Sequence, residues 1–481
     1  MTTSTHGKYS LSLLFLFLIS LPLVNPWVRG DGVGYYAYAR ALLIQHNLHF
    51  EADWRAANTS FSEGRVDANG QLVPDQFSAT GYVKNHFSIG PAILWAPFLV
   101  GTHAFVLTAD RLGAAIPANG FSRPYVITMA LATAFYGFCG LLLAFDLARR
   151  YFSETCAFLA TLGIWLASSL PVYMYFNPSW SHAQSAFSVA LFLWYWQRTR
   201  GQRTIRQWLV LALLAGLMMN IYYPNAIVLL VPGVEALSEY RAAFLAGKSE
   251  PKEPGRLFLR HAAFVFVATA ALLPTFLTRW ILYGNALETG YPSLRTWSWL
   301  SPSLLAVLFS SDHGLLTWTP ILIPAVAGLV IFSRRDAILG GGLLLSFLAF
   351  YYFIASYPSW DGISSFGNRF FVSLTPLFVI GLAASLDSFV GLWRRSAQGM
   401  AVASATIALL VLWNGGAIFQ WGTAMIPARG PISWRQMVHN QYAVVPAQIV
   451  KSMELYAFRR DAMMQGIEQR DVQRLKEDPR P

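Results

Sequence analysis

Residues 11–40 read LSLLFLFLISLPLVNPWVRGDGVGYYAYAR, an apolar run that ends in a charged, glycine-rich turn. The run Leu11–Val28 has about the length, roughly 17–25 residues, that crosses a bilayer as a helix. No small-residue cleavage site lies just behind it, so we interpret it as an uncleaved first span. Asp31 follows between two glycines, and Tyr35–Leu43 is typical of a helix lying in the membrane interface. The stretch therefore predicts a carboxylate held where lipid meets water.

The whole chain is too apolar for a water-soluble protein. Hydrophobic residues make up 55% of its 481 residues, and charged residues only 12%, about half of the usual share of roughly 25%. In a bilayer such runs form helices, because every backbone polar group must be satisfied internally. The sequence therefore predicts an all-α polytopic membrane protein with these apolar runs: Leu11–Val28, Phe87–Ala109, Pro124–Ala148, Thr155–Tyr175, Ala183–Trp196, Trp208–Ile221, Pro224–Leu237, Leu257–Leu282, Thr317–Phe332, Ala337–Ala355, Phe370–Leu386 and Ala401–Phe419.

The charged residues indicate orientation rather than a nucleic-acid partner. Lys and Arg outnumber Asp and Glu by 35 to 24, but they stand in short clusters between apolar runs, without the interleaved aromatics of a nucleic-acid-binding patch. The two cysteines, Cys139 and Cys156, form neither a disulfide framework nor a zinc motif. We expect the following basic clusters to be cytoplasmic: Arg149-Arg150; Arg198, Arg200, Arg203 and Arg206; Arg241, Lys248, Lys252, Arg256 and Arg260; Arg334-Arg335; Arg394-Arg395.

An even number of spans must separate two clusters on the same side of the membrane, and this requirement fixes the number of spans. Two apolar runs separate each neighbouring pair of clusters, as cytoplasmic clusters require. Lys8 and Arg149 are both expected inside, so Phe87–Ala109 should lie along the outer interface or dip in and return. The prediction is about eleven transmembrane helices, with interfacial helices in the first outer loop and the C-terminus outside.

Most of the polar chain is then predicted on the outer side. The membrane domain covers residues 1–420 and includes the large outer loop 29–123, and a tail at 421–481 follows it. Within the tail, Ala447–Lys476 has the spacing of an amphipathic helix. Because the loops outside are long and the cytoplasmic loops are short, we expect the chemistry to take place outside.

Two acidic positions are candidate functional groups. Asp31 could act on a ligand, because its flanking glycines permit close approach, or it could cap the helix Tyr35–Leu43. Asp312-His313 stands between two apolar stretches near membrane depth, where ionisable groups are costly and usually functional.

Three basic residues are candidate phosphate ligands. Lys84 and His86 lead into the apolar run Phe87–Ala109, and they could recognise a lipid-linked phosphate or simply anchor the interface. Arg369 is the single arginine of its outer loop, against the orientation rule, and its forked guanidinium matches phosphate oxygens. The alternative is an ion pair between Arg369 and Asp361.

Other protein classes lack support. The chain has no P-loop, no His-Glu-x-x-His and no nucleophile elbow. Charged residues are almost absent from the predicted spans, which argues against an ion-coupled transporter.

Taken together, these motifs resemble the GT-C superfamily of membrane glycosyltransferases, which includes protein O-mannosyltransferases and lipid A aminoarabinose transferases. The similarity covers roughly residues 8–420. It includes an acidic residue and a tyrosine early in the first loop (Asp31, Tyr35), and a lysine before a proline-containing helix (Lys84, Pro91). Arg149-Arg150-Tyr151-Phe152 resembles their cytoplasmic turn, and Leu308–Leu316 and Ser365-Phe366-Gly367-Asn368-Arg369 resemble motifs of a bacterial subgroup.

The resemblance implies transfer of a hexosyl or pentosyl unit from a polyprenyl phosphate, with inversion, to a lipid, glycan or protein acceptor of the cell envelope. Asp31 would be the general base, and Lys84 and Arg369 would bind the donor phosphate. It implies a bacterial inner membrane protein with its site on the outer face. The resemblance leaves open whether the enzyme needs a divalent cation, for which Asp31 is one possible ligand. The remaining substrate-binding candidates are Tyr35, His86, Asp312, His313 and Asp361.

One alternative function stays open from the sequence. A transporter or flippase of lipid-linked saccharides would also need membrane spans and phosphate-binding residues, but it would form no glycosidic bond. It does not explain why most loop residues are predicted outside.

Overall fold

A computed structural model describes residues 7–245 and 254–477 of the chain. Within these residues the chain is helical, and its β-structure is limited to two isolated bridges, Val66 with Leu72 and Phe77 with Val83. The predicted all-α class is therefore confirmed. Lys248 and Lys252 of the predicted basic clusters lie outside the described residues.

The first region consists of one apolar helix followed by short helices and a long one. The predicted first span breaks at Pro22, because a proline has no N–H to continue the α-helical bonding. The elements are α1 (Lys8–Ser20), η1 (Leu21–Leu23), α2 (Asp31–Arg40), η2 (Ala41–Gln45), α3 (Glu51–Arg55), α4 (Thr59–Ser62), η3 (Pro74–Gln76) and α5 (Gly90–Arg111).

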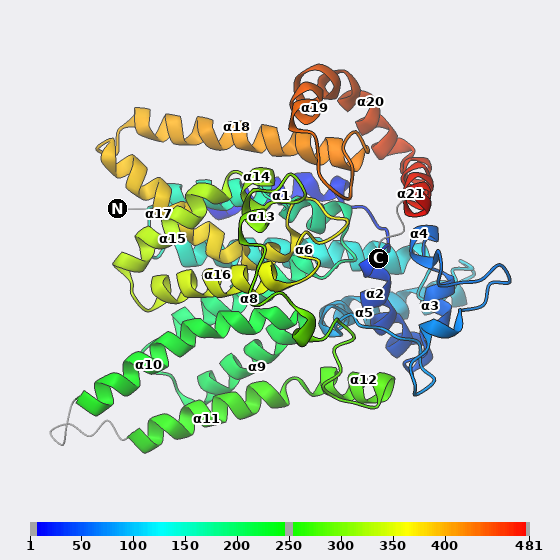
Figure 1. Ribbon diagram of the computed structural model, residues 1–481, viewed down its shortest axis with the longest axis horizontal. Coiled ribbons are helices and arrows are strands. Elements are labelled where there is room, and N and C mark those ends of the chain that lie inside the picture. Colours follow the sequence, from blue (N-terminus) through cyan, green and yellow to red (C-terminus); the bar gives the residue numbers. More distant parts are fainter. Residues whose placement is uncertain (1–6, 246–253, 478–481) are drawn as a thin grey trace.

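The bundle of longer helices follows (Figure 1). Helix contact depends on glycine where α15 crosses α17: a Cβ on Gly328 would lie 1.7 Å from the Gly381 carbonyl oxygen. The elements are α6 (Arg123–Ala148), α7 (Glu154–Leu166), η4 (Val172–Phe176), α8 (His182–Arg198), α9 (Ile205–Ile221), η5 (Tyr223–Leu229), α10 (Leu230–Leu245), α11 (Pro254–Ala270), α12 (Leu273–Tyr283), η7 (Leu294–Thr296), α13 (Leu304–Phe309), α14 (Leu315–Trp318), α15 (Leu322–Arg335), α16 (Leu339–Ser356), η8 (Arg369–Leu374), α17 (Thr375–Leu392) and α18 (Ala397–Gly422).

The predicted count of eleven spans is not confirmed. Among the described helices, five are long and apolar enough to cross a membrane, or six if the bent pair α11 and α12 is one span. Several predicted runs form shorter helices because prolines and polar turns interrupt them, as between α7 and η4 at Pro171. α5 is among the five, so the expected interfacial position of Phe87–Ala109 stays a prediction.

α5 packs beside the first half of α6 and close to α2. Trp95 Nε1 donates to Thr133 Oγ1 at 2.8 Å, and His103 Nδ1 lies 2.6 Å from the Tyr125 hydroxyl. The two helices are therefore antiparallel over this length. In Figure 1 they meet α2, α3 and α4 at one end of the molecule, which we call the Asp31 end.

The opposite end, which we call the Arg149 end, holds the last turns of α6 and α8. Trp194 Nε1 on α8 donates to Asp146 at 2.8 Å, and Asp146 also accepts hydrogen bonds from Arg149 and Arg150. Tyr9 of α1 reaches Thr155 at this end, at 2.7 Å. The predicted clusters Arg149-Arg150 and Arg198–Arg206 thus share one end of the bundle.

The C-terminal tail returns to the Asp31 end as α19 (Trp434–His439), η9 (Asn440–Val444), α20 (Val445–Phe458) and α21 (Arg460–Glu477). The predicted single helix Ala447–Lys476 is wrong in one respect, because the chain leaves helical geometry at Arg459 (φ −134°, ψ 39°) and forms two helices. The domain boundary at residue 420 falls in the last turn of α18 and stays a prediction.

Candidate functional site

An ion pair between Asp31 and Arg369 forms the centre of the site. Asp31 is the first residue of α2, and Arg369 is the first residue of η8. Arg369 Nη1 donates to Asp31 Oδ2 at 2.7 Å, and the two side chains are 12% (Arg369) and 31% (Asp31) exposed. The cap interpretation is wrong, because Gly30 occupies the N-cap and no side chain caps α2. Arg369 therefore pairs with Asp31 and not, as the alternative had it, with Asp361.

The Arg369 guanidinium keeps unused donor capacity. Its Cζ atom lies 4.5 Å from the centre of the Trp180 ring, so the aromatic face supports the charge. Its Nε atom is buried and has no hydrogen-bond partner. A buried cation with an unpaired donor is costly unless something else supplies an acceptor. The Arg369 guanidinium therefore has a donor that its pair with Asp31 does not use.

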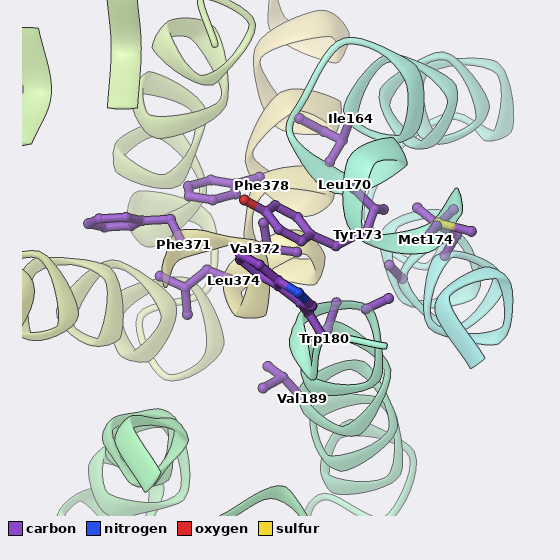
Figure 2. Packing of buried hydrophobic residues seen from close by; sticks show 14 of the residues in the cluster. Ile164, Leu170, Tyr173, Met174, Trp180, Val189, Phe371, Val372, Leu374 and Phe378 are labelled. Carbon is purple, nitrogen blue, oxygen red and sulfur yellow. The ribbon is translucent and has the colours of Figure 1, made fainter. Parts of the chain in front are cut away.

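Aromatic side chains belong to a buried hydrophobic cluster that includes residues just after Arg369 in the chain (Figure 2). Tyr173 and Trp180 have ring centres 5.8 Å apart, and both point toward the segment that carries Val372 and Leu374. These residues lie directly after Arg369 in the chain. The hydrophobic cluster therefore fixes the base of the helix that presents Arg369.

The loop before Arg369 is strained. Gly362 and Gly367 adopt positive φ angles of 74° and 57°, and Ile363 does so at 60°, which is unfavourable for a β-branched residue. The Ser365 hydroxyl donates to the Gly367 carbonyl at 2.8 Å and holds the turn closed. Backbone strain of this kind is found mainly at functional sites.

Arg279 fixes the segment that follows Lys84. Its guanidinium donates to the carbonyl oxygens of Asn85, His86 and Phe87 at 2.7, 2.8 and 2.9 Å. The sequence analysis missed Arg279, although a charged residue inside the apolar run Leu257–Leu282 was the signal that could have found it. Arg279 is therefore a structural residue of the site, with its donors already used.

His86 is part of the site, and Lys84 points elsewhere. The His86 ring stacks near Phe87 and lies edge-on to Tyr291 at 5.1 Å between ring centres. Burial lowers the pKa of His86 to about 4, so the ring is neutral near pH 7. The exposed Lys84 side chain donates to the Asp75 carbonyl at 2.9 Å. Its predicted phosphate contact stays a prediction, without support from this conformation.

Tyrosines near the ion pair supply protonated hydroxyls. Burial, and secondly the negative charge of Asp31, raise the pKa of Tyr35. Burial also raises the pKa of Tyr291 and of Tyr357, and Asp31 contributes to both shifts. These hydroxyls keep their protons and can donate hydrogen bonds to sugar or phosphate oxygens. Sequence reasoning missed Tyr291 and Tyr357, because tyrosines are too common here to stand out.

A second cation lies within electrostatic range of Asp31. Burial lowers the pKa of Arg65, and the Asp31 charge opposes that shift. Arg65 Nη1 donates to the Phe61 carbonyl at 2.5 Å, and the guanidinium lies 4.5 Å from the Phe61 ring centre. Arg65 was not predicted, because it stands in a polar loop where arginine is ordinary.

Three predicted residues form a group that could hold a metal ion. Asp312, His313 and Asp361 each offer a ligand atom within 4.8 Å of the others, and Asp31 is not in this group. The His313 Nδ1 atom donates to the Asp361 carbonyl at 3.0 Å, while its buried Nε2 atom has no partner. A ring that donates one N–H to a carbonyl has its other nitrogen free as a metal ligand. The residues therefore fit a divalent cation.

No protein-family model and no curated protein sequence matches the chain. Among solved structures, the archaeal oligosaccharyltransferase AglB from Archaeoglobus fulgidus, in complex with an inhibitory peptide and a dolichol-phosphate, is similar with a TM-score of 0.54 and 14% identity. The match covers 87% of this chain and 56% of AglB, so the chain spans little more than half of that protein. ArnT from Cupriavidus metallidurans in the apo state is similar over 88% of this chain and 72% of its own length, with a TM-score of 0.51 and 14% identity.

Both structures are membrane glycosyltransferases of the GT-C superfamily. The chain shares its fold with these two proteins, and the predicted resemblance is confirmed at the level of the fold. With its apolar helices, the protein is a polytopic membrane protein.

Proposed function

We propose that the protein is an inverting membrane glycosyltransferase, which moves a sugar from a polyprenyl phosphate to an acceptor hydroxyl. The observation that carries the proposal is the Asp31–Arg369 ion pair with its unused, buried donor at Arg369 Nε. A general base and a phosphate-binding cation are the two groups that this reaction needs. In our proposal Asp31 is the base and Arg369 is the cation.

The proposed reaction assigns one role to each member of the pair. The acceptor hydroxyl attacks the anomeric carbon from the side opposite the phosphate, and its proton passes to Asp31. The bond between that carbon and the phosphate oxygen breaks, and the electron pair leaves with the lipid phosphate. Arg369 stabilises the negative charge that develops there, because preplaced donors in a site with little water interact strongly with a new charge. Proton transfer to a well-placed base typically contributes about 10²–10⁴-fold.

Other residues of the site shape the pocket. Arg65 is the second cation that we assign to the phosphate, because Lys84 is engaged by Asp75. Tyr35, Tyr291 and Tyr357 would donate hydrogen bonds to the sugar. Neutral His86 would pack against the sugar or the acceptor and could accept one hydrogen bond.

Asp312, His313 and Asp361 would hold a divalent cation if the enzyme uses one. Such an ion would supply positive charge for the leaving phosphate as a Lewis acid. The chain's own residues would fix its place, because His313 is tied to the backbone of the loop that presents Arg369.

We also propose that the Asp31 end faces the periplasm of a bacterial inner membrane, because the Arg149 end carries the basic clusters. A polyprenyl-linked donor and an envelope acceptor would then meet at the Asp31 end.

A transfer assay tests the function. Purified protein in nanodiscs is incubated with radiolabelled polyprenyl-phosphate sugars and envelope extracts, beside an Asp31→Asn control. We expect label in an acceptor only with the native protein. If instead the protein moves the labelled lipid across a vesicle membrane and forms no new bond, the flippase alternative is correct.

A further inference from the structure

Helix α21 contacts the residue two positions before Asp31. Arg29 forms an ion pair with Asp471 on α21, and the two side chains are only 19% and 22% exposed. The Arg29 guanidinium also lies 4.4 Å from the Trp27 ring centre. A half-buried pair supported by a ring holds its geometry better than an exposed one.

A second contact reaches the residue directly before Asp31. Asn58 Nδ2 donates to both carboxylate oxygens of Glu468 on α21, at 2.9 and 3.1 Å. The other end of the same amide, Asn58 Oδ1, accepts a hydrogen bond from the Gly30 N–H at 3.2 Å. Glu468 also accepts from the Ser60 N–H. Glu468 therefore orients an amide that holds the backbone from which α2 starts.

The backbone at this point determines where Asp31 lies. Gly30 has φ 53° and ψ −133°, a conformation that residues with a Cβ rarely adopt. The Arg29 carbonyl accepts a hydrogen bond from Trp180 Nε1 at 3.0 Å, and the ring of Trp180 supports Arg369. The segment Arg29-Gly30 therefore contacts Trp180, which packs against Arg369, and it leads directly into Asp31.

The start of α21 is itself anchored to the connection between α1 and α2. Arg460 donates to the carbonyl oxygens of Val24 and Pro22 at 2.6 and 2.8 Å. The Tyr456 hydroxyl donates to the Leu23 carbonyl at 2.6 Å. The tail therefore binds the residues that precede Asp31 at several points along residues 22–30.

We propose that α21 is a positioning element for the Asp31–Arg369 pair, with Glu468 and Asp471 as its positioning residues. The inference rests on the proposed function for its effect on turnover. Neither residue touches substrate. Each acts through Arg29 or Asn58, by holding the backbone turn from which Asp31 projects.

A charge swap tests this role in the full-length protein. Asp471→Arg places two like charges together, and Arg29→Asp does the same with the opposite sign. We expect each single variant to lower kcat about tenfold to a hundredfold, the range for misplacing a catalytic group by about 1 Å, with KM for the donor little changed. The double variant, Arg29→Asp with Asp471→Arg, restores the pair and should recover most of kcat. Glu454→Arg, the same charge change at an exposed position of α20, is the matched control and should leave kcat unchanged.

Hydrogen–deuterium exchange separates this inference from the proposed function. Uptake in a peptide covering residues 28–36 should rise in Asp471→Arg and Glu468→Lys, and return to the native level in the charge swap. This readout needs no activity, so it remains informative if no sugar transfer is found. Unchanged uptake in both single variants, or equal losses of kcat in the single and double variants, would overturn the positioning role.

Discussion

Two ion pairs, Arg203–Glu235 at the Arg149 end and Arg369–Asp31 at the Asp31 end, use the donors of their arginine differently. At the Arg149 end, Arg203 donates from Nη1 to Glu235 at 2.8 Å, from Nη2 to the Trp196 carbonyl at 2.9 Å and from Nε to Thr199 at 3.1 Å. Glu235 also accepts from Trp196 Nε1 at 2.8 Å. At the Asp31 end, Arg369 donates to Asp31 while its buried Nε has no partner.

This difference distinguishes an ion pair that only stabilises the fold from one that can also bind a ligand. A buried charge with every donor used stabilises one packing and has nothing left for a ligand. A buried donor without a partner destabilises the folded protein, and a bound ligand can remove that penalty by supplying the acceptor. The two guanidinium groups therefore differ in one respect: Arg203 uses each of its nitrogens, and Arg369 keeps an unpaired Nε donor.

Removing Arg369 should have the largest effect of the variants that test this comparison. Arg369→Ala removes the cation that we assign to the leaving phosphate, and loss of one such donor typically costs about 10²–10³-fold in kcat. Steady-state transfer assays measure the change. Arg369→Lys should rescue little, because an ammonium cannot hold a carboxylate and a phosphate in fixed directions. Full activity in Arg369→Lys would contradict the proposal that the guanidinium holds the carboxylate and the phosphate in fixed directions.

At the opposite end, the effect should appear in stability. Glu235→Gln leaves Arg203 buried without its counter-charge, which typically costs about 3–5 kcal/mol of unfolding free energy. Thermal unfolding in detergent measures it, and kcat per folded molecule should stay near the native value. A loss of kcat without a loss of stability would show that the comparison of the two ends is wrong.

The metal-binding group should give a smaller effect. Chelator treatment should lower transfer, and Asp361→Asn should lower the affinity for the restoring divalent cation about 10–100-fold. A titration of chelated protein with Mn²⁺, Mg²⁺ and Zn²⁺ compares the native protein and the variant. Activity that is unaffected by chelation would exclude an essential metal at this group.

The pH dependence of stability through His313 should be the smallest effect. Burial lowers the pKa of His313 from its ordinary 6.5 to about 4, so between these values the unfolded chain binds a proton that the folded protein does not. Stability should therefore fall as the pH drops from 6.5 toward 4. The variant His313→Asn keeps a donor for the Asp361 carbonyl and tolerates the positive φ of 57°. Between pH 6.5 and pH 5, the Tm of this variant should fall by about 2 °C less than the Tm of the native protein. Parallel Tm curves for the two proteins would contradict this assignment.

Charged residues in apolar surroundings were the features that sequence reasoning could use. Asp31, Arg369 and Asp312-His313 stand out for that reason, and the structure brings Asp312, His313 and Asp361 together. The contact between Asp31 and Arg369 could not be predicted, because 338 positions separate them and it depends on where α2 and η8 lie in the folded chain.

Other residues of the site could not be recognised from the sequence. Trp180 and Tyr291 belong to a chain in which 15% of residues are aromatic, so neither is distinctive. The direction of Lys84 depends on the turn that brings Asp75 near it, which residue type does not reveal. The predicted count of eleven spans is not confirmed, because prolines divide some of the apolar runs into shorter helices, as at Pro22. The contacts of α21 with Arg29 depend on where the tail folds back, which amphipathic spacing does not determine.

A single-turnover experiment on Asp31→Asn tests whether Asp31 is the general base. Labelled donor is bound to the native protein and to the variant until both are saturated, and then a single transfer to acceptor is followed in time. We expect the variant to bind donor as well as the native protein and to transfer it about 10²–10⁴-fold more slowly. Transfer by the variant at the native rate would contradict Asp31 as the base and leave the Asp31–Arg369 pair as structure alone.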